Sequence, residues 1–226
     1  VFVDRDHQCN STKVVCDSKL AAIAHVTTTQ VVIEGKTILG TGDAKFVLVQ
    51  GDKQLIKLEK AADKHNAFAG NLKKFLDSVK DDFDVCLIDT NPNPDVRMMI
   101  ALVLSDYVLS PIQLNQEALD GIGALYSDIK KIKSSLNPKL EFIGILPNLV
   151  ENTPFQKANL KQLIEGFSQL LIGMDGGAFA HIPTRTAVAE AQAATAPIWT
   201  LGKSSAREAW KIIEPVFNVI AKRMGV

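Results

Sequence analysis

The sequence predicts an α/β fold: a doubly wound, mostly parallel sheet flanked by helices. Apolar strand-like runs alternate along the chain with segments of helical spacing, and short turns join them. The strand-like runs are nearly continuous in Val, Ile, Leu and Phe, as expected when helices cover both faces of a parallel sheet. The 226 residues are enough for one large core. We therefore expect a single domain over residues 1–226.

Eight apolar runs are predicted as strands, and the first begins at residue 1. Five of them are strong and three are weaker. The strong runs cover residues 1–4, 46–50, 84–89, 106–112 and 142–147, and the weaker ones cover residues 30–33, 178–182 and 197–201.

Helical spacing of apolar residues fills the longer intervals between the strands. Residues 53–80 show it, with a break expected near Gly70, and residues 117–134 show it again. Thr153 followed by Pro154 is a favourable opening for a helix over residues 153–172. A long helix over residues 204–224 is expected to close the chain.

The segment 34–43 contains Gly35-Lys36-Thr37, which looks like the end of a phosphate-binding loop. Such a loop needs a glycine five residues before its second glycine, and Gln30 stands at that position. The bulky side chains of residues 31–33 would also keep backbone amides away from a phosphate. We interpret the segment as a hairpin-like connection.

Composition excludes several classes of protein. Acidic and basic residues number 25 each, so any contact with nucleic acid must come from a local patch. No apolar run approaches the roughly 20 residues needed to span a bilayer, and no signal peptide is recognisable. The three cysteines have neither the number nor the spacing of a disulfide or zinc framework, which favours a reducing, cytoplasmic setting. His7 and Cys9 are therefore not expected to bind metal.

Two acidic segments each end a strand-like run. Asp4 and Asp6 follow the first strand, and Asp89 ends the run over residues 84–89. Carboxylates at the carboxyl ends of parallel strands lie in the crevice where doubly wound proteins bind ligands. Three of them at one place suit a Mg²⁺–phosphate site.

Residues 3–12 are similar to a strand followed by D-x-D-P-Q-G-N-[ST], and residues 83–92 resemble a Walker B strand with D-x-P-P. In these segments the chain resembles a known family, the ParA-type partition ATPases of the MinD/ParA group of deviant P-loop NTPases. Residues 101–113 resemble N-A-L-x-A-A-D-x-V-L-I-P-V-Q, continued by residues 118–121. Residues 181–185 and 189–191 are similar to the later I-P-x-x…x-E-A segment. The order and spacing of these segments make the resemblance specific.

The resemblance implies roles for particular residues and implies ATP/ADP and Mg²⁺ as cofactors. Asp6 would position the attacking water, while Asp4 and Asp89 would hold Mg²⁺ and its waters. Such roles agree with phosphoryl transfer, which depends on positioning and charge neutralisation. The adenine base would be contacted by Asn148 and covered by Pro183 and Thr184.

The resemblance also implies a partition ATPase that dimerises on ATP and binds DNA non-specifically to position plasmid or chromosome cargo. A ParB-like partner would stimulate hydrolysis, in a cytoplasmic, nucleoid-associated setting without membrane contact. The basic candidates for DNA are Arg185, Lys203 and Arg207, since Ala187 stands at the family's basic position. The alternatives are a ParA-like scaffold that has lost its nucleotide site, and a MinD-like membrane-cycling ATPase that uses the terminal segment 216–226.

The sequence departs from the family pattern in several places. His7 replaces a proline, Cys9 a glycine and Asn91 the first proline after the Walker B strand. The family's opening strand, K-G-G-V-G-K-T-T phosphate loop and helix are missing before residue 1. Such a βα unit needs about 25–30 residues, so we expect a parent chain of about 250 residues. We expect that parent to hydrolyse ATP and residues 1–226 alone to be inactive, because the loop supplies the amide cradle and lysine.

Overall fold

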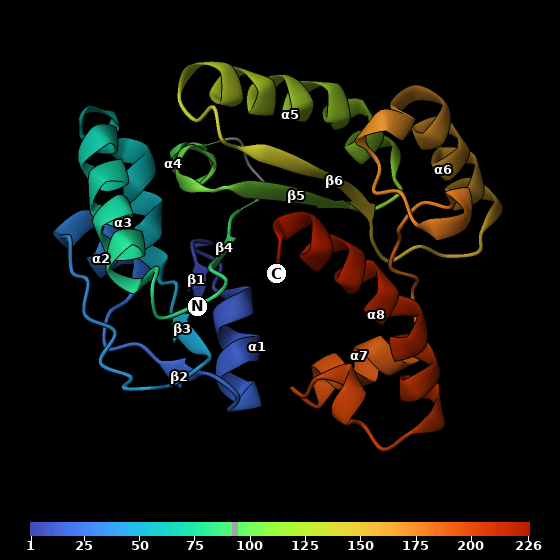
Figure 1. The fold of residues 1–226 in the computed structure, drawn as a ribbon, viewed down its shortest axis with the longest axis horizontal. Helices are drawn as coiled ribbons and strands as arrows, with labels where there is room; N and C mark the ends of the chain where they lie inside the picture. Colours follow the sequence, from blue (N-terminus) through green and yellow to red (C-terminus); the bar gives the residue numbers. More distant parts are fainter. Residues whose placement is uncertain (92–94) are drawn as a thin grey trace. The chain divides into compact units, whose positions relative to one another are not determined.

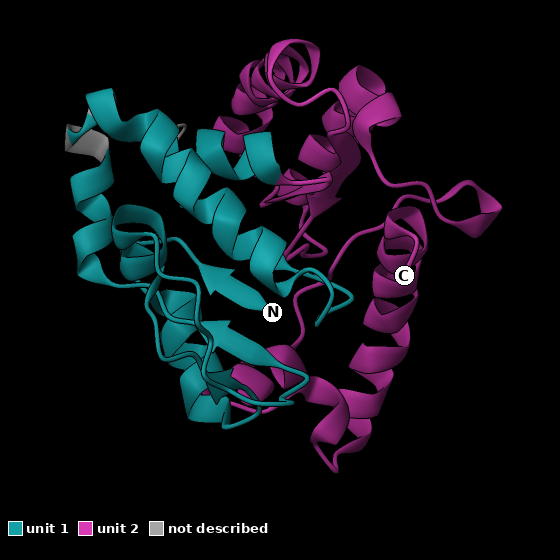
Figure 2. Cartoon of the chain, turned by 60° about the vertical axis from the view of Figure 1, so that its left-hand side comes forward, with its two compact units in different colours: residues 1–104 teal, residues 105–226 magenta. Residues whose placement is uncertain are grey.

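The computed structural model describes residues 1–91 and 95–226 and forms two compact units, residues 1–104 and residues 105–226 (Figure 2). Each unit combines parallel strands with helices, which confirms the predicted α/β class. The single domain over residues 1–226 stays a prediction. In the part of the chain that the structure describes, none of the helices has both the length and the apolar character to cross a membrane.

The first unit is built on a parallel four-stranded sheet (Figure 1). Its strands are β1 (Phe2–Asp4), β2 (Ala22–Ile23), β3 (Val47–Val49) and β4 (Leu87–Asp89), in the order β2-β3-β1-β4. β1 therefore pairs with β3 on one side and with β4 on the other. The register places Asp4 directly opposite Asp89, so the carboxyl ends of β1 and β4 carry neighbouring carboxylates.

Helices of the first unit pack apolar side chains onto this sheet. Val3 and the β3 residues Val47 and Val49 are fully buried in one cluster with side chains of α2 and α3. The helical elements are α1 (Asn10–Ser18), α2 (Thr28–Glu34), η1 (Lys53–Lys60), η2 (Ala62–Lys64), α3 (His65–Val79) and α4 (Val96–Leu104). α2 and α3 lie in contact with each other (Figure 1).

The second unit contains a parallel pair, β5 (Tyr107–Ile112) and β6 (Glu141–Pro147). Helix α5 packs Ile122 into the cluster that holds β6 Ile145, and α8 packs Val216 against β6 Ile143. The helices are α5 (Gln116–Ser135), α6 (Pro154–Phe167), α7 (Thr186–Ala193) and α8 (Ser204–Met224), with short 3₁₀ turns η3 (Ser168–Leu170), η4 (Asp175–Gly177) and η5 (Ile198–Thr200).

The weaker strand predictions are wrong. Residues 30–33 lie in α2, because Thr27 and Gln30 form a capping box at its start and Gly35 ends it in the left-handed region. Residues 197–201 form the turn η5. Residues 178–182 belong to no named strand and make only single bridges and hydrogen bonds, such as Ala180 N to Ile172 O.

Two predictions about the longer segments also need correction. The helical pattern over residues 53–80 breaks at Ala61 instead of Gly70, which lies inside α3. The segment 34–43 is a connection without a phosphate loop, as expected, but it is not a hairpin, since it joins helix α2 to strand β3. Gly40 has a φ of +67° there, and a Cβ on it would lie 2.1 Å from His25 Nδ1.

Candidate functional site

Asp4 is the most buried carboxylate of the predicted site, with no exposed surface. Its Oδ1 accepts the Asp6 backbone N–H at 2.9 Å. Its Oδ2 accepts the backbone N–H of Thr12 at 2.9 Å and the Thr12 hydroxyl at 2.6 Å. Three donors to a buried carboxylate satisfy its oxygens and fix its orientation. Asp4 thus ties the end of β1 to the first turn of α1.

Gly51 approaches Asp4 from the end of β3. Its backbone N–H donates to Thr12 Oγ1 at 2.9 Å, so this hydroxyl accepts from Gly51 while it donates to Asp4. A Cβ on Gly51 would lie 2.9 Å from Asp4 Cγ and 3.0 Å from the Asp6 backbone oxygen. Only glycine leaves room for the carboxylate at this place.

Asp89 ends β4 opposite Asp4 and is partly buried. Its Oδ2 accepts the hydroxyl of Ser11, from the first turn of α1, at 2.5 Å. Burial raises the pKa of Asp89 above its ordinary value, and the charges of Asp4 and Asp6 add to the rise, while the Ser11 hydroxyl opposes it. A nearby cation would relieve this cost of ionisation.

Asp6 lies in a tight turn between β1 and α1. Its Oδ1 accepts the Gln8 backbone N–H at 3.0 Å, and its backbone oxygen accepts the Cys9 N–H at 3.1 Å. Cys9 takes a left-handed conformation with φ of +57°, at the position where the family has glycine. The Asp6 side chain remains 18% exposed, so water can reach it.

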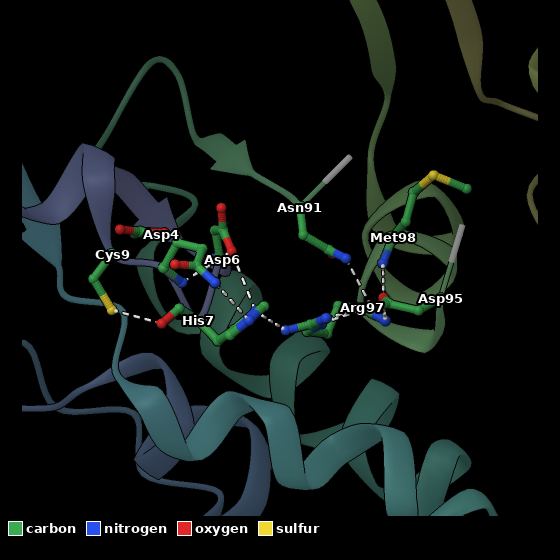
Figure 3. A network of polar contacts seen from close by, with 9 residues as sticks. Asp4, Asp6, His7, Cys9, Asn91, Asp95, Arg97 and Met98 are labelled. Carbon is green, nitrogen blue, oxygen red and sulfur yellow. Dashed lines mark hydrogen bonds and ion pairs between the residues drawn. The ribbon is translucent and has the colours of Figure 1, made fainter. Parts of the chain in front are cut away.

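A polar network joins this turn to the start of α4 (Figure 3). Arg97 Nη1 lies 2.8 Å from His7 Nδ1, while its Nε and Nη2 both donate to Asp95 Oδ2. Asn91 Nδ2 donates to the same oxygen at 2.7 Å. Burial alone would raise the pKa of Asp95, but the hydrogen bonds from Arg97 and Asn91 hold it below its ordinary value.

Arg5 adds a second buried guanidinium close to this network. It has no exposed surface, and its three guanidinium nitrogens make no hydrogen bond to any of the residues described here. Burial lowers the pKa of Arg5 to about 10. The negative charge of Asp95 opposes this lowering, and the positive charge of Arg97 adds to it. The first unit therefore holds two buried arginines near one partnering carboxylate.

The donor set fits Mg²⁺ held mainly through water. Within residues 1–91 and 95–226, no group of three or more His, Cys, Asp or Glu side chains is arranged to hold a metal ion. The oxygens of Asp4 are already occupied by protein donors. Mg²⁺ commonly keeps several waters and takes one or two carboxylates plus phosphate oxygens. Asp89 and the Ser11 hydroxyl are the best placed direct or water-mediated contacts.

The predicted adenine contacts come together inside the second unit. Asn148 follows β6, and its Oδ1 accepts the backbone N–H of Leu149 at 3.0 Å. Residues 182–184 run alongside, because Ile182 N–H donates to Pro147 O and Thr184 N–H donates to Val150 O, both at 2.9 Å. Pro183 bridges to Val150. These contacts join segments that are far apart in the sequence.

The predicted DNA-contacting residues also belong to the second unit. Arg185 precedes α7, while Lys203 precedes α8 and Arg207 lies in its first turn. Lys203 Nζ forms an ion pair with Glu190 Oε2 at 2.9 Å, so part of its charge is already neutralised. Arg207 Nη1 makes a long contact of 3.5 Å to the Gly202 carbonyl oxygen. Arg185 and Arg207 are thus the stronger candidates of the three.

Sequence reasoning missed several residues of the site. Gly51 directly follows a predicted strand, so the strand-end rule that found Asp89 could also have found it. Ser11 and Thr12 lie in a matched motif but received no role. Arg97 and Asp95 carry no sequence signal of their contacts. Pro92, the last residue of the Walker B match, lies outside the described residues.

A protein family and several known proteins are similar to this chain. Residues 1–142 match the AAA_31 family, described as an AAA domain. Protein IncC of Escherichia coli is 32% identical over 182 residues, which are 80% of this chain and 48% of IncC. The chromosome-partitioning ATPase Soj of Treponema pallidum is 36% identical over 74 residues, 33% of this chain and 29% of Soj. The chain thus spans about half the length of IncC.

A solved structure shares the fold. Cobyrinic acid a,c-diamide synthase from Mycobacterium smegmatis, with a bound ATP analogue and magnesium, aligns with a TM-score of 0.67 at 22% identity. The alignment covers 92% of this chain and 79% of that chain.

Proposed function

Because the chain belongs to the AAA_31 family of AAA domains, in the ParA/MinD group of P-loop ATPases, we propose that it acts as the ATPase of a DNA-partition system. The observation that carries the proposal is the pairing of Asp4 with Asp89 at the carboxyl ends of β1 and β4. The similarity to Soj, named as a chromosome-partitioning ATPase, favours partition over other uses of the fold.

In the proposed reaction, each carboxylate has a separate task. Asp6, partly exposed at the tip of its turn, accepts a hydrogen bond from the attacking water and orients it. Asp89 and the Ser11 hydroxyl would hold the waters of Mg²⁺, and Asp4 keeps the first turn of α1 in place. The metal would supply positive charge that neutralises the phosphate oxygens. Asn148, Pro183 and Thr184 enclose the adenine of ATP or ADP.

Hydrolysis also needs a glycine-rich loop that cradles the phosphates, and residues 1–226 contain no such sequence. The proposal therefore places ATP hydrolysis in a complete protein that carries this loop, and expects residues 1–226 by themselves to be inactive. Comparing ATP turnover by the two proteins tests this point. Turnover by residues 1–226 alone would contradict it.

The carboxylates are tested in the complete protein. We expect Asp6→Asn and Asp89→Asn to lower kcat by about a hundredfold or more, since each removes a charge that the reaction uses. Asp128→Asn is the matched control, because Asp128 is a partly exposed residue of α5 that pairs with Lys131 and belongs to the second unit, not to the unit that holds the three carboxylates. Equal loss in all three variants, or in none, would contradict the assignment of roles.

The proposal extends to partners by similarity. The protein forms an ATP-dependent homodimer in the cytoplasm, associates with the nucleoid by binding DNA non-specifically, and is stimulated by a ParB-like partner. Charge reversal at Arg185 and Arg207 is expected to weaken DNA binding about tenfold or more. Charge reversal at Lys130 and Lys133, on α5, changes the net charge equally and serves as the control. Equal weakening by both pairs would dismiss Arg185 and Arg207 as a local site.

Two outcomes would point to other functions. A complete protein that neither binds nor hydrolyses ATP would be a partition-like scaffold. ATP-dependent sedimentation with anionic liposomes would instead indicate a membrane-cycling ATPase.

A further inference from the structure

His7 lies between a guanidinium that can only donate a hydrogen bond to its imidazole ring and a carboxylate that can only accept one from it. Arg97 Nη1 is 2.8 Å from His7 Nδ1, and Asp6 Oδ1 is 3.4 Å from the same nitrogen (Figure 3). A guanidinium has only donors, so Nδ1 must accept from Arg97 and cannot carry a proton. The neutral ring therefore keeps its proton on Nε2, and the Gln8 side-chain amide, whose nitrogen lies 3.0 Å from Nε2, must turn its oxygen toward this proton to accept it.

Arg97 is held rigidly enough to impose this tautomer. Its side chain is 1% exposed, and its Nε and Nη2 both donate to Asp95 Oδ2. The Arg97 backbone N–H donates to the other carboxylate oxygen of Asp95 at 2.8 Å. Asn91 fixes Asp95 in turn. A planar guanidinium clamped on one edge holds Nη1 in a set direction, here within 2.8 Å of His7 Nδ1.

Resting on the proposed ATPase function, we infer that Arg97 is a positioning residue for Asp6 that acts through His7. Arg97 occupies His7 Nδ1 and so keeps the imidazole proton away from Asp6 Oδ1. That oxygen already accepts the Gln8 backbone N–H. A second donor from His7 would compete with the attacking water for the carboxylate. The Asp95–Arg97–His7 chain therefore leaves Asp6 able to orient water.

Removal of Arg97 has a specific consequence. Without this donor, the imidazole proton can move to Nδ1, and a closure of a few tenths of an ångström from 3.4 Å makes a hydrogen bond to Asp6. We expect Arg97→Met in the complete protein to lower kcat about tenfold or more, with little change in KM for ATP.

A second substitution separates positioning from structural support. Leucine at position 7 has no proton to donate, so adding His7→Leu is expected to restore most of the kcat lost in Arg97→Met. If Arg97 only supports the fold, the double variant will be as slow as Arg97→Met or slower, and the inference fails.

A measurement without turnover tests the same inference on residues 1–226. Two-bond ¹H–¹⁵N spectra at alkaline pH, where an ordinary imidazole is neutral, report which ring nitrogen of His7 carries the proton. We expect a bare Nδ1 and a protonated Nε2. A protonated Nδ1 would overturn the inference even if the complete protein hydrolyses ATP. If the complete protein shows no ATP turnover, the proposed function is overturned. The tautomer of His7 then still decides whether Arg97 keeps the imidazole proton away from Asp6.

Discussion

Gly51 shows how a single missing side chain shapes the site. Its backbone N–H contacts the same Thr12 hydroxyl that donates to Asp4, and a Cβ would meet Asp4 Cγ at 2.9 Å. The methyl group of alanine would have to push a fully buried carboxylate off its three donors. The requirement for glycine comes from this close approach of backbone to carboxylate.

We expect Gly51→Ala to lower the free energy of unfolding by about 1–3 kcal/mol, because overpacking forces neighbouring groups apart. ATP turnover by the complete protein should fall as well, since Asp4 and Asp6 lie on either side of the added methyl group. Gly70→Ala is the matched control: Gly70 lies in helix α3 with open space around it, and alanine there should stabilise the protein by about 0.5–1 kcal/mol. Urea titrations measure both changes. Equal effects at the two positions would contradict the steric explanation.

The raised pKa of Asp89 makes the stability of the fold depend on pH. Burial raises the pKa of Asp89 in the folded state above the ordinary value of 3.8. The unfolded chain therefore tolerates the charge better, and the ionised carboxylate destabilises the fold at neutral pH. The cost disappears as pH falls through the raised pKa of the folded state toward the ordinary value.

We therefore expect Asp89→Asn to stabilise the metal-free residues 1–226 at neutral pH. The gain should shrink to nothing as the pH approaches 3.8, where wild-type Asp89 is itself protonated. Denaturant titrations at several pH values measure it. If Asp89→Asn destabilises the protein at neutral pH, the ionised Asp89 carboxylate does not reduce the stability of the fold.

Among the elements, helix α2 shows why local signals can mislead. The apolar run over residues 30–33 predicted a strand, yet Thr27 and Gln30 fit the S/T-x-x-E/Q pattern of a capping box. The capping signal was in the sequence and outweighs the β-branched run, which packs Val31 and Val32 into the core from a helix. Each of the five strong strand predictions corresponds to a named strand, since nearly continuous apolar runs suit a parallel sheet.

The capping box can be tested directly. Thr27→Ala removes the side-chain acceptor of the Gln30 backbone N–H and should lower stability by about 1 kcal/mol. Lys64→Ala, at the N-cap of α3, removes a residue that makes no side-chain cap and should change little. Thermal unfolding of residues 1–226 compares the two variants. Equal shifts in Tm would show that the box contributes nothing.

The residues of the site also divide into those that the sequence could predict and those that it could not. Asp4 and Asp89 could be predicted because a strand-end carboxylate carries its own signal. The contact between His7 and Arg97 could not, since these residues are 90 positions apart and neither belongs to a repeating pattern. Most of the residues missed have roles that depend on the pairing of β1 with β3 and with β4.

At the scale of the whole molecule, the fold does not select a function. It is shared with a cobyrinic acid a,c-diamide synthase at 22% identity, so partition is favoured by the similarity to Soj and by the residues of the site. The formal net charge of zero adds a physical limit on DNA binding. Attraction can come only from a local patch, which limits how many counterions are released.

We expect the affinity of the complete protein for DNA to fall with salt along a log–log slope of about −2 to −3, as for two or three phosphate contacts. Fluorescence anisotropy with a DNA duplex at increasing salt gives the slope. Arg185→Glu should make it shallower by about one unit. A slope near −6 would require a larger basic surface than the three predicted residues supply.

The hydrogen bond between Ser11 and Asp89 spans 78 positions of the chain. Closing a loop of that length costs conformational entropy before any contact repays it, so strand β4 joins the sheet late compared with local helices. During synthesis, the carboxylate pair does not exist until residue 89 has emerged and paired with β1. The carboxylate pair of the first unit therefore forms only when its parallel sheet is nearly complete, and a nascent or misassembled chain lacks the pair on which the proposed function depends.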